Sequence, residues 1–244
     1  MKNFSQILTI VALSTATIFS SCNTEEEVPN LGMGEGKMGV ALVLKNNSTP
    51  ASNARIENTG FTIEKGFIQI KELELEVEGK NESGDFEREI DIEFDDIKKI
   101  TFNEFDKSVD FFLNIPEGEY KEIDLELDLI DHKNEPSIYF EGKFVNSEGV
   151  STPFKFEYFG DDIDFEVEID ADDDNYFKVD RVNNPLALFE LNAGNWMKNV
   201  TTSEMNNAQK TDGVILLTRN SNKSIYEKIK NNIEASSEIE VDLD

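Results

Sequence analysis

The 244-residue sequence predicts an all-β fold, mainly an antiparallel β-sandwich, with a short helix near the C-terminus. Apolar and charged residues alternate over many short segments, which is typical of strands with one buried and one solvent-facing side. About ten to twelve such segments follow one another at short spacing, which favours antiparallel neighbours packed in two layers. Hydrophobic residues form 38% of the chain and include 18 phenylalanines, which is enough for a core and excludes a disordered chain.

The first part of the chain, residues 1–21, has the pattern of a secretory signal peptide. Its apolar run, Ile7–Phe19, is too short for an ordinary membrane-spanning helix. Cys22, the only cysteine, directly follows two serines and resembles the cysteine of the bacterial lipobox, with Phe19 in the place of the usual leucine. The resemblance implies that the signal is removed and that fatty acids on Cys22 anchor the protein in the membrane. The alternative is an ordinary signal peptide with an incidental cysteine.

Residues 22–36 have the composition of an acidic tether, and residues 37–244 of one β-sandwich domain. Glu25, Glu26 and Glu27 lie just after the cysteine. They resemble the acidic export tag of lipoproteins from the Bacteroidetes phylum, which implies a location on the outer face of the outer membrane. The alternative is a polar tether that carries no address.

The strands are predicted from the alternation, in chain order, at residues 37–44, 67–79, 87–94, 120–130, 137–145, 152–159 and 162–170. In the second of these the apolar positions step by three between Ile70 and Leu73, which indicates a bulge. Residues 137–145 and 152–159 form a hairpin. Residues 185–192 and 213–218 are more uniformly apolar, so we expect them at central positions of a sheet.

Two helices are expected near the end of the chain. Residues 202–210 form a short one. In the second, residues 224–236, Ser224 and Glu227 have the spacing of a capping box. Ile225, Ile229 and Ile233 form one apolar stripe, which we expect to dock on a sheet rather than on a partner.

The charge is strongly negative, because 51 acidic residues face 23 basic ones for a net charge of −28. Phosphate backbones would be repelled, so nucleic acids are excluded as partners, and anionic lipid headgroups are disfavoured for the same reason. Most acidic residues belong to the solvent-facing side of strands, where they favour solubility and oppose edge pairing. The alternative is that they bind cations or a cationic partner.

The sequence predicts no catalytic centre. The only histidine, His132, lies in a predicted turn, and a second cysteine for zinc is missing. No nucleophile elbow, phosphate loop or dinucleotide fingerprint occurs. We therefore expect that the protein is not an enzyme and needs no cofactor, calcium being the one candidate ion.

The calcium hypothesis rests on Asp170, Asp172 and Asp174, which have the first, third and fifth spacing of a calcium loop. The match ends there, because Asn175 stands where the loop needs glycine and Arg181 where it needs glutamate. An acidic β-turn is our first interpretation and a non-standard calcium loop the second.

The only tryptophan, Trp196, lies in a turn-rich stretch between the last strands and the second helix. Its first interpretation is a core residue that closes one end of the sandwich. The alternative is an exposed platform on which a sugar ring stacks.

As a whole, the chain resembles the Bacteroidetes lipoproteins that carry a β-sandwich domain of unknown function. The resemblance rests on the lipobox, the acidic tag, the opening strand at residues 36–44, and residues 112–127, where a turn with Pro116, Gly118 and Tyr120 precedes a long alternating strand. It covers residues 20–130 and implies no known activity. We expect a surface-exposed binding module for a polysaccharide, a protein or a cation. The alternative is a structural or accessory lipoprotein of an envelope complex.

Overall fold

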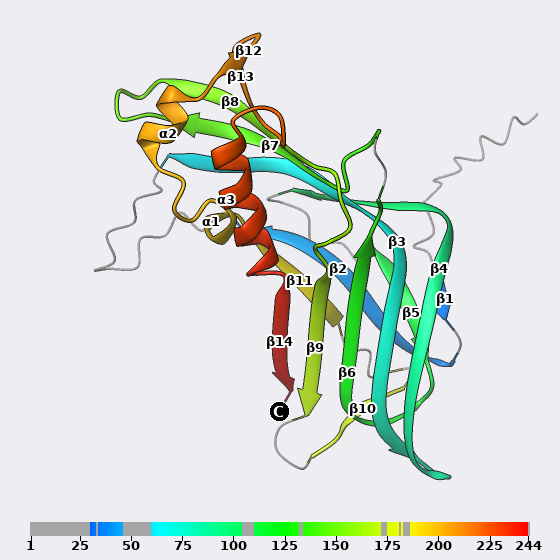
Figure 1. Cartoon of the computed structure of the whole chain (residues 1–244). Helices are drawn as coiled ribbons and strands as arrows, with labels where there is room; N and C mark the ends of the chain where they lie inside the picture. Colours follow the sequence, from blue (N-terminus) through cyan, green and yellow to red (C-terminus); the bar gives the residue numbers. More distant parts are fainter. Residues whose placement is uncertain are drawn as a thin grey trace, which may run out of the picture.

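The structure is a computed structural model that describes residues 30–32, 34–45, 60–103, 110–131, 134–171, 175–180, 182 and 186–243. These residues form an all-β fold, as predicted, with fourteen strands and three helices in the described part (Figure 1). Two sheets face each other, and their strands cross at an angle, so the architecture is sandwich-like.

The smaller sheet has four strands in the order β1-β5-β2-β11. Their bounds are β1 Asn30–Gly32, β5 Phe111–Ile115, β2 Gly36–Lys45 and β11 Leu186–Asn192. Strand β1 lies in the range that the sequence assigns to the tether and pairs with β5, so the folded part includes residues before Lys37.

The larger sheet has ten strands, eight of them in the order β12-β13-β8-β7-β3-β6-β9-β14, with β10 paired to β6 and β4 to β3. The bounds are β3 Phe61–Asn81, β4 Gly84–Asn103, β6 Gly118–Leu129, β7 Ile138–Val145, β8 Ser151–Tyr158, β9 Phe165–Ala171, β10 Phe177–Val179, β12 Lys210–Thr211, β13 Val214–Leu217 and β14 Glu238–Leu243.

Strands β3 and β4 are long and bend together near their middle (Figure 1). The register between them shifts between Ile70 and Glu72, which confirms the predicted bulge. The bend splits the large sheet into two parts. The first half of β3 pairs with β7, and the second half pairs with β6.

The core lies between the sheets and follows the predicted alternation. On β6, for example, Ile123, Leu125 and Leu127 are fully buried, while the acidic residues between them face outward. Such strict alternation fixes the register, because a slip by one residue would expose every apolar side chain of the strand.

The helices are α1 Ala193–Trp196, α2 Thr202–Asn207 and α3 Lys223–Glu234. The apolar stripe of α3 is buried, as predicted, and Tyr226 on the same face stacks on Phe156 of β8 with ring centroids 5.5 Å apart. The docking of α3 on the sheet is thereby confirmed.

The predicted capping box of the second helix is wrong. Helix α3 begins after Asn222, which has a left-handed backbone and makes no side-chain cap. Its amide instead binds the backbone of Gln209 and Leu216, so a tertiary contact replaces the local cap. The capping box occurs on α2, between Thr201 and Glu204.

The predicted central positions of the two uniformly apolar strands are also wrong in part. Strand β11 lies at an edge of the small sheet, parallel to β2. Strand β13 lies between β8 and the two-residue β12, and its side chains alternate between buried and half-buried. Four strand pairs of the described part are parallel, because β1, β11, β13 and β14 each reach their neighbour after a long connection.

Candidate functional site

One face of the large sheet carries carboxylates on three neighbouring strands. We define the acidic face as the outward-pointing side chains of β3, β6 and β9 together with the residue just before β9: Glu72, Glu74, Glu76, Glu78, Glu122, Asp124, Glu126, Asp128, Asp164, Glu166, Glu168 and Asp170. They are half-buried or exposed, whereas the alternate side chains of the same strands lie in the core.

The strand register places these carboxylates in rows across the sheet. Glu74 pairs with Glu126, which pairs with Glu166; the next row joins Glu76, Asp124 and Glu168. Directly opposite residues in antiparallel strands have Cβ atoms about 5 Å apart, so like charges are forced together. At the border of the face the ammonium of Lys121 lies 3.4 Å from a carboxylate oxygen of Glu78.

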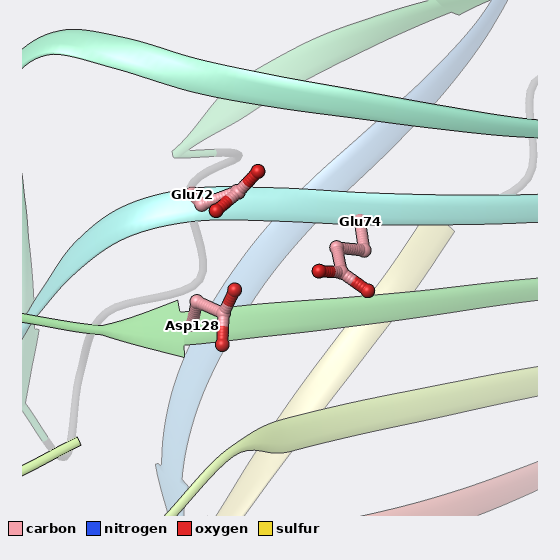
Figure 2. A group of neighbouring side chains, drawn as sticks. All are labelled: Glu72, Glu74 and Asp128. Atoms are coloured by element: carbon pink, nitrogen blue, oxygen red, sulfur yellow. The ribbon is translucent and has the colours of Figure 1, made fainter.

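Three clusters of carboxylates on this face have oxygen atoms that lie within 4.8 Å of one another. The first joins Glu72 and Glu74 of β3 to Asp128 of β6, and Figure 2 shows these three carboxyl groups gathered over the two strands. The others are Glu126 with Asp128 and Asp164, and Glu122 with Glu168 and Asp170. Asp128 belongs to the first two of these clusters, so those two are contiguous.

Burial and mutual repulsion make ionisation of this face unfavourable. Partial burial, followed by the charge of Glu166 and a hydrogen bond with it, raises the pKa of Asp124 to about 7. Burial first, and neighbouring carboxylates second, also raise the pKa values of five other members: Glu72, Glu74, Glu122, Glu126 and Asp164. A bound proton or a bound cation would relieve the repulsion.

Two oxygen atoms on the face are buried and accept no hydrogen bond: Oδ1 of Asp124 and Oδ1 of Asp164. A buried acceptor without a donor is costly in free energy, and such exceptions need a physical explanation. Asp164 belongs to one of the three clusters, so its carboxyl group lies beside other carboxylates. A cation bound by this carboxyl group would compensate its negative charge.

The clusters fit a hard divalent cation. Calcium binds six to eight oxygen atoms at roughly 2.4 Å, so two ligands of one ion are at most about 4.8 Å apart. Three carboxylates can supply up to six oxygens when each binds through both atoms, and water can supply the rest. The donors are oxygen only, which disfavours zinc and copper.

The predicted calcium loop is only partly described, because Asp172 and Asp174 lie outside the described residues. Asp170 is at the end of β9, where it joins Glu122 and Glu168 in a cross-strand cluster. Cys22, Glu25, Glu26, Glu27 and His132 also lie outside the described residues. Their roles stay predictions.

Trp196 is a core residue, so the alternative of a sugar-stacking platform is wrong. Its side chain is 1% exposed, and its ring lies 6.0 Å from that of Phe102 and 5.2 Å from that of Phe140. The backbone carbonyl of Trp196 accepts a hydrogen bond from Asn232 of α3. A buried ring has no face free for a sugar.

The sequence prediction treated the alternating acidic residues as a solvated surface and missed the clusters. The signal was present, because three strands each carry acids at every second position over several residues. What the sequence lacks is the order of the strands, which decides whether these rows lie side by side.

Comparison with protein-family models, with curated proteins and with solved structures gave no match. Within the described part of the chain, no helix has the length and apolar character to cross a membrane. The residues of the acidic face and the N-terminal sequence are therefore the features that bear on function.

Proposed function

We propose that this protein is a lipid-anchored, non-enzymatic binding module of the cell envelope that holds divalent cations, calcium above all, on its acidic face. The observation that carries the proposal is the set of three carboxylate clusters, in each of which one oxygen of every residue lies within 4.8 Å of the others; one cluster contains Asp164, which also has a buried oxygen without a hydrogen-bond donor. The raised pKa values of five cluster members support it, because burial and neighbouring carboxylates disfavour their negative charge even though Lys71 and Lys121 lie nearby.

Calcium is favoured over magnesium by the construction of the site. Magnesium requires near-ideal octahedral geometry at short distances and keeps most of its water. Half-exposed carboxylates on three strands form an adaptable set of oxygens, which suits the larger and less demanding calcium ion. Sites of this open kind in extracellular modules bind calcium at roughly 0.1 to 1 mM.

The proposed location agrees with such an affinity. Fatty acids on Cys22 would anchor the protein in the outer membrane, and Glu25, Glu26 and Glu27 would direct it to the outer face. A module there meets the calcium of the medium rather than the low concentration of the cytoplasm. The acidic face would also repel anionic headgroups, which keeps the sheet away from the membrane surface unless cations bridge them.

The test is a calcium titration of thermal unfolding in the mature protein. At about 10 mM calcium and the affinity above, binding should add roughly 1.4 to 2.7 kcal/mol to the free energy of unfolding. For a domain of this size that corresponds to a rise in Tm of about 3 to 10 °C. Magnesium at equal concentration should give less, and sodium at equal ionic strength should give less still.

The variant that tests the site is Glu126→Gln, Asp128→Asn, Asp164→Asn, which removes all three charges of one cluster and one of the three charges of its neighbour. It should lose most of the calcium-dependent rise in Tm. The matched control is Glu135→Gln, Glu148→Gln, Asp212→Asn, which removes the same charge from exposed residues outside the face. An equal loss in both variants, or a wild-type Tm that does not respond to calcium, would reject the proposal.

A further inference from the structure

Strand β4 is an edge strand of the large sheet, because it pairs with β3 and, among the described residues, with no other strand. Its first half, residues 85–93, runs in unbroken register against β3, from the pair Lys80–Asp85 to the pair Glu72–Glu93. Within the described part of the chain no backbone hydrogen bond reaches the outer side of this segment. The free edge exceeds the ordinary strand length of about five or six residues.

The two rows of side chains on this segment differ sharply in character. The outward row, on the same side as the acidic face, consists of five exposed carboxylates: Asp85, Glu87, Glu89, Asp91 and Glu93. None of the five takes part in an ion pair with another described residue. The inward row is half-buried against the core and consists mainly of Phe86, Ile90, Ile92 and Phe94.

Long free edges are templates for the addition of another strand, and proteins usually protect them. Residues 85–93 contain no proline, no lysine and no bulge; Arg88, in the inward row, is the one basic residue. The row of carboxylates is the remaining feature that protects this edge against the addition of another strand, and its effect depends on the charge of that strand. It repels a strand that carries acids, including the β4 strand of a second copy, and it attracts a strand that carries bases.

We propose that the edge of β4 at residues 85–93 docks an extended segment of a partner protein in which basic and apolar residues alternate. The basic side chains would lie beside the carboxylate row, and the apolar ones would extend the half-buried row that begins with Phe86 and ends with Phe94. The backbone of the added segment would supply the hydrogen bonds that the edge lacks. This docking does not require calcium on the acidic face.

The test measures binding of a labelled peptide of about ten residues, with lysine and valine in alternation, to the mature protein by fluorescence anisotropy. A chelator removes calcium, so failure of the calcium proposal does not affect the outcome. The comparison peptide has the same composition with the lysines and the valines in two blocks. Binding of the alternating peptide at least tenfold tighter is expected, because only alternation matches the two rows of β4.

Charge reversal gives the specificity test. Glu87→Lys, Glu89→Lys, Asp91→Lys should lose the basic peptide and gain an otherwise identical peptide in which glutamate replaces lysine. The control Glu135→Lys, Glu148→Lys, Asp161→Lys changes the same amount of charge at exposed positions away from β4, and it should keep the original preference. A similar loss in the control would mean that only the net charge of the protein attracts the peptide.

Hydrogen exchange locates the peptide. Backbone amides of residues 85–93 should exchange quickly at alternate positions in the free protein and become protected in the complex. Three outcomes would overturn the proposal: equal binding of the block peptide, protection elsewhere on the sheet, or an edge that is already protected in the free protein. The last would mean that another segment of this chain or a second copy covers β4, and light scattering distinguishes the two.

Discussion

Substitution of Asp124 should change the pH dependence of stability more than substitution of an exposed neighbour on the acidic face. The carboxyl of Asp124 lies on β6, in the row with Glu76 and Glu168. One of its oxygens is buried without a hydrogen-bond donor, and burial together with Glu166 raises its pKa to about 7. The substitution Asp124→Asn keeps the shape of the side chain and removes the charge. In calcium-free buffer, the variant should therefore be more stable than the wild type at alkaline pH.

The sign follows from the direction of the pKa change. The folded-state pKa, about 7, lies above the ordinary value of 3.8. The folded protein therefore holds a proton that the unfolded chain releases, and the resulting stability is complete below about pH 4 and disappears as the pH rises through about 7. Above that pH the wild type keeps an unfavourable charge that the asparagine variant lacks.

The magnitude follows from the same values. A rise of about three pKa units corresponds to about 4 kcal/mol. Asp124 is only half-buried, so solvent screening reduces the expected effect to about 2 kcal/mol. For a domain of this size, Tm should rise by about 4 to 8 °C at about pH 8.5 and by about 1.5 to 3 °C at pH 5, where over a third of the effect is already present.

The assay is thermal unfolding followed by circular dichroism at both pH values, with a chelator present. The control variant is Glu76→Gln, because Glu76 is the exposed neighbour of Asp124 on β3 and carries the same charge. It should change Tm by much less than Asp124→Asn at alkaline pH. If the asparagine variant is no more stable than the wild type at about pH 8.5, or if its advantage is the same at both pH values, burial and repulsion do not act on Asp124 as argued.

Three further predictions concern the lipid anchor on Cys22, the acidic export signal and the core. Cys22→Ser should abolish labelling with a fatty-acid analogue and release the protein from membranes; a variant that still pellets in carbonate would contradict lipid anchoring. Glu25→Ala, Glu26→Ala, Glu27→Ala should fold and pellet normally but become resistant to protease added to intact cells, and equal digestion of both proteins would exclude the glutamates as an address. Trp196→Ala should reduce the free energy of unfolding by about 3 to 5 kcal/mol, measured by denaturant titration, because a fully buried ring is removed; a loss below about 1 kcal/mol would contradict its place in the core.

The strands were predictable because alternation is a local property. Residues 120–130 show which side chains of β6 face the core without any knowledge of its neighbours, and the structure buries those side chains. The bulge after Ile70 was predictable for the same reason, since a change of phase in the pattern has to appear as an extra residue in the strand.

The order of the strands was not predictable, because it depends on contacts between distant parts of the chain. Strand β14 reaches β9, and β11 reaches β2, only after long connections, and both pairs are parallel. The start of α3 depends on a distant contact too. Ser224 and Glu227 have the spacing of a capping box, but the hydrogen bonds between Asn222 and Gln209 determine where the helix begins.

The candidate site could not be predicted for the same reason, because it depends on the order of the strands. The chain contains the carboxylates of β3, β6 and β9 at positions separated by tens of residues, and only the register brings Glu74, Glu126 and Glu166 into one row. The predicted calcium loop was local and short, whereas the clusters in the structure span strands. Of the three aspartates in the predicted loop, Asp170 lies in the described part of the chain, and it belongs to a cluster.

A proton and a divalent cation are two ways to lower the same repulsion, so they should compete for the acidic face. Below about pH 7 the wild type relieves Asp124 by protonation, and calcium then gains less from binding nearby. Calcium binding should therefore release protons and weaken as the pH falls. In the proposed location outside the cell, the stability of the sheet would then depend on both the calcium concentration and the pH. If the affinity for calcium is the same at about pH 5 and pH 8, the ion binds away from the groups with raised pKa values, and the acidic face is not its site.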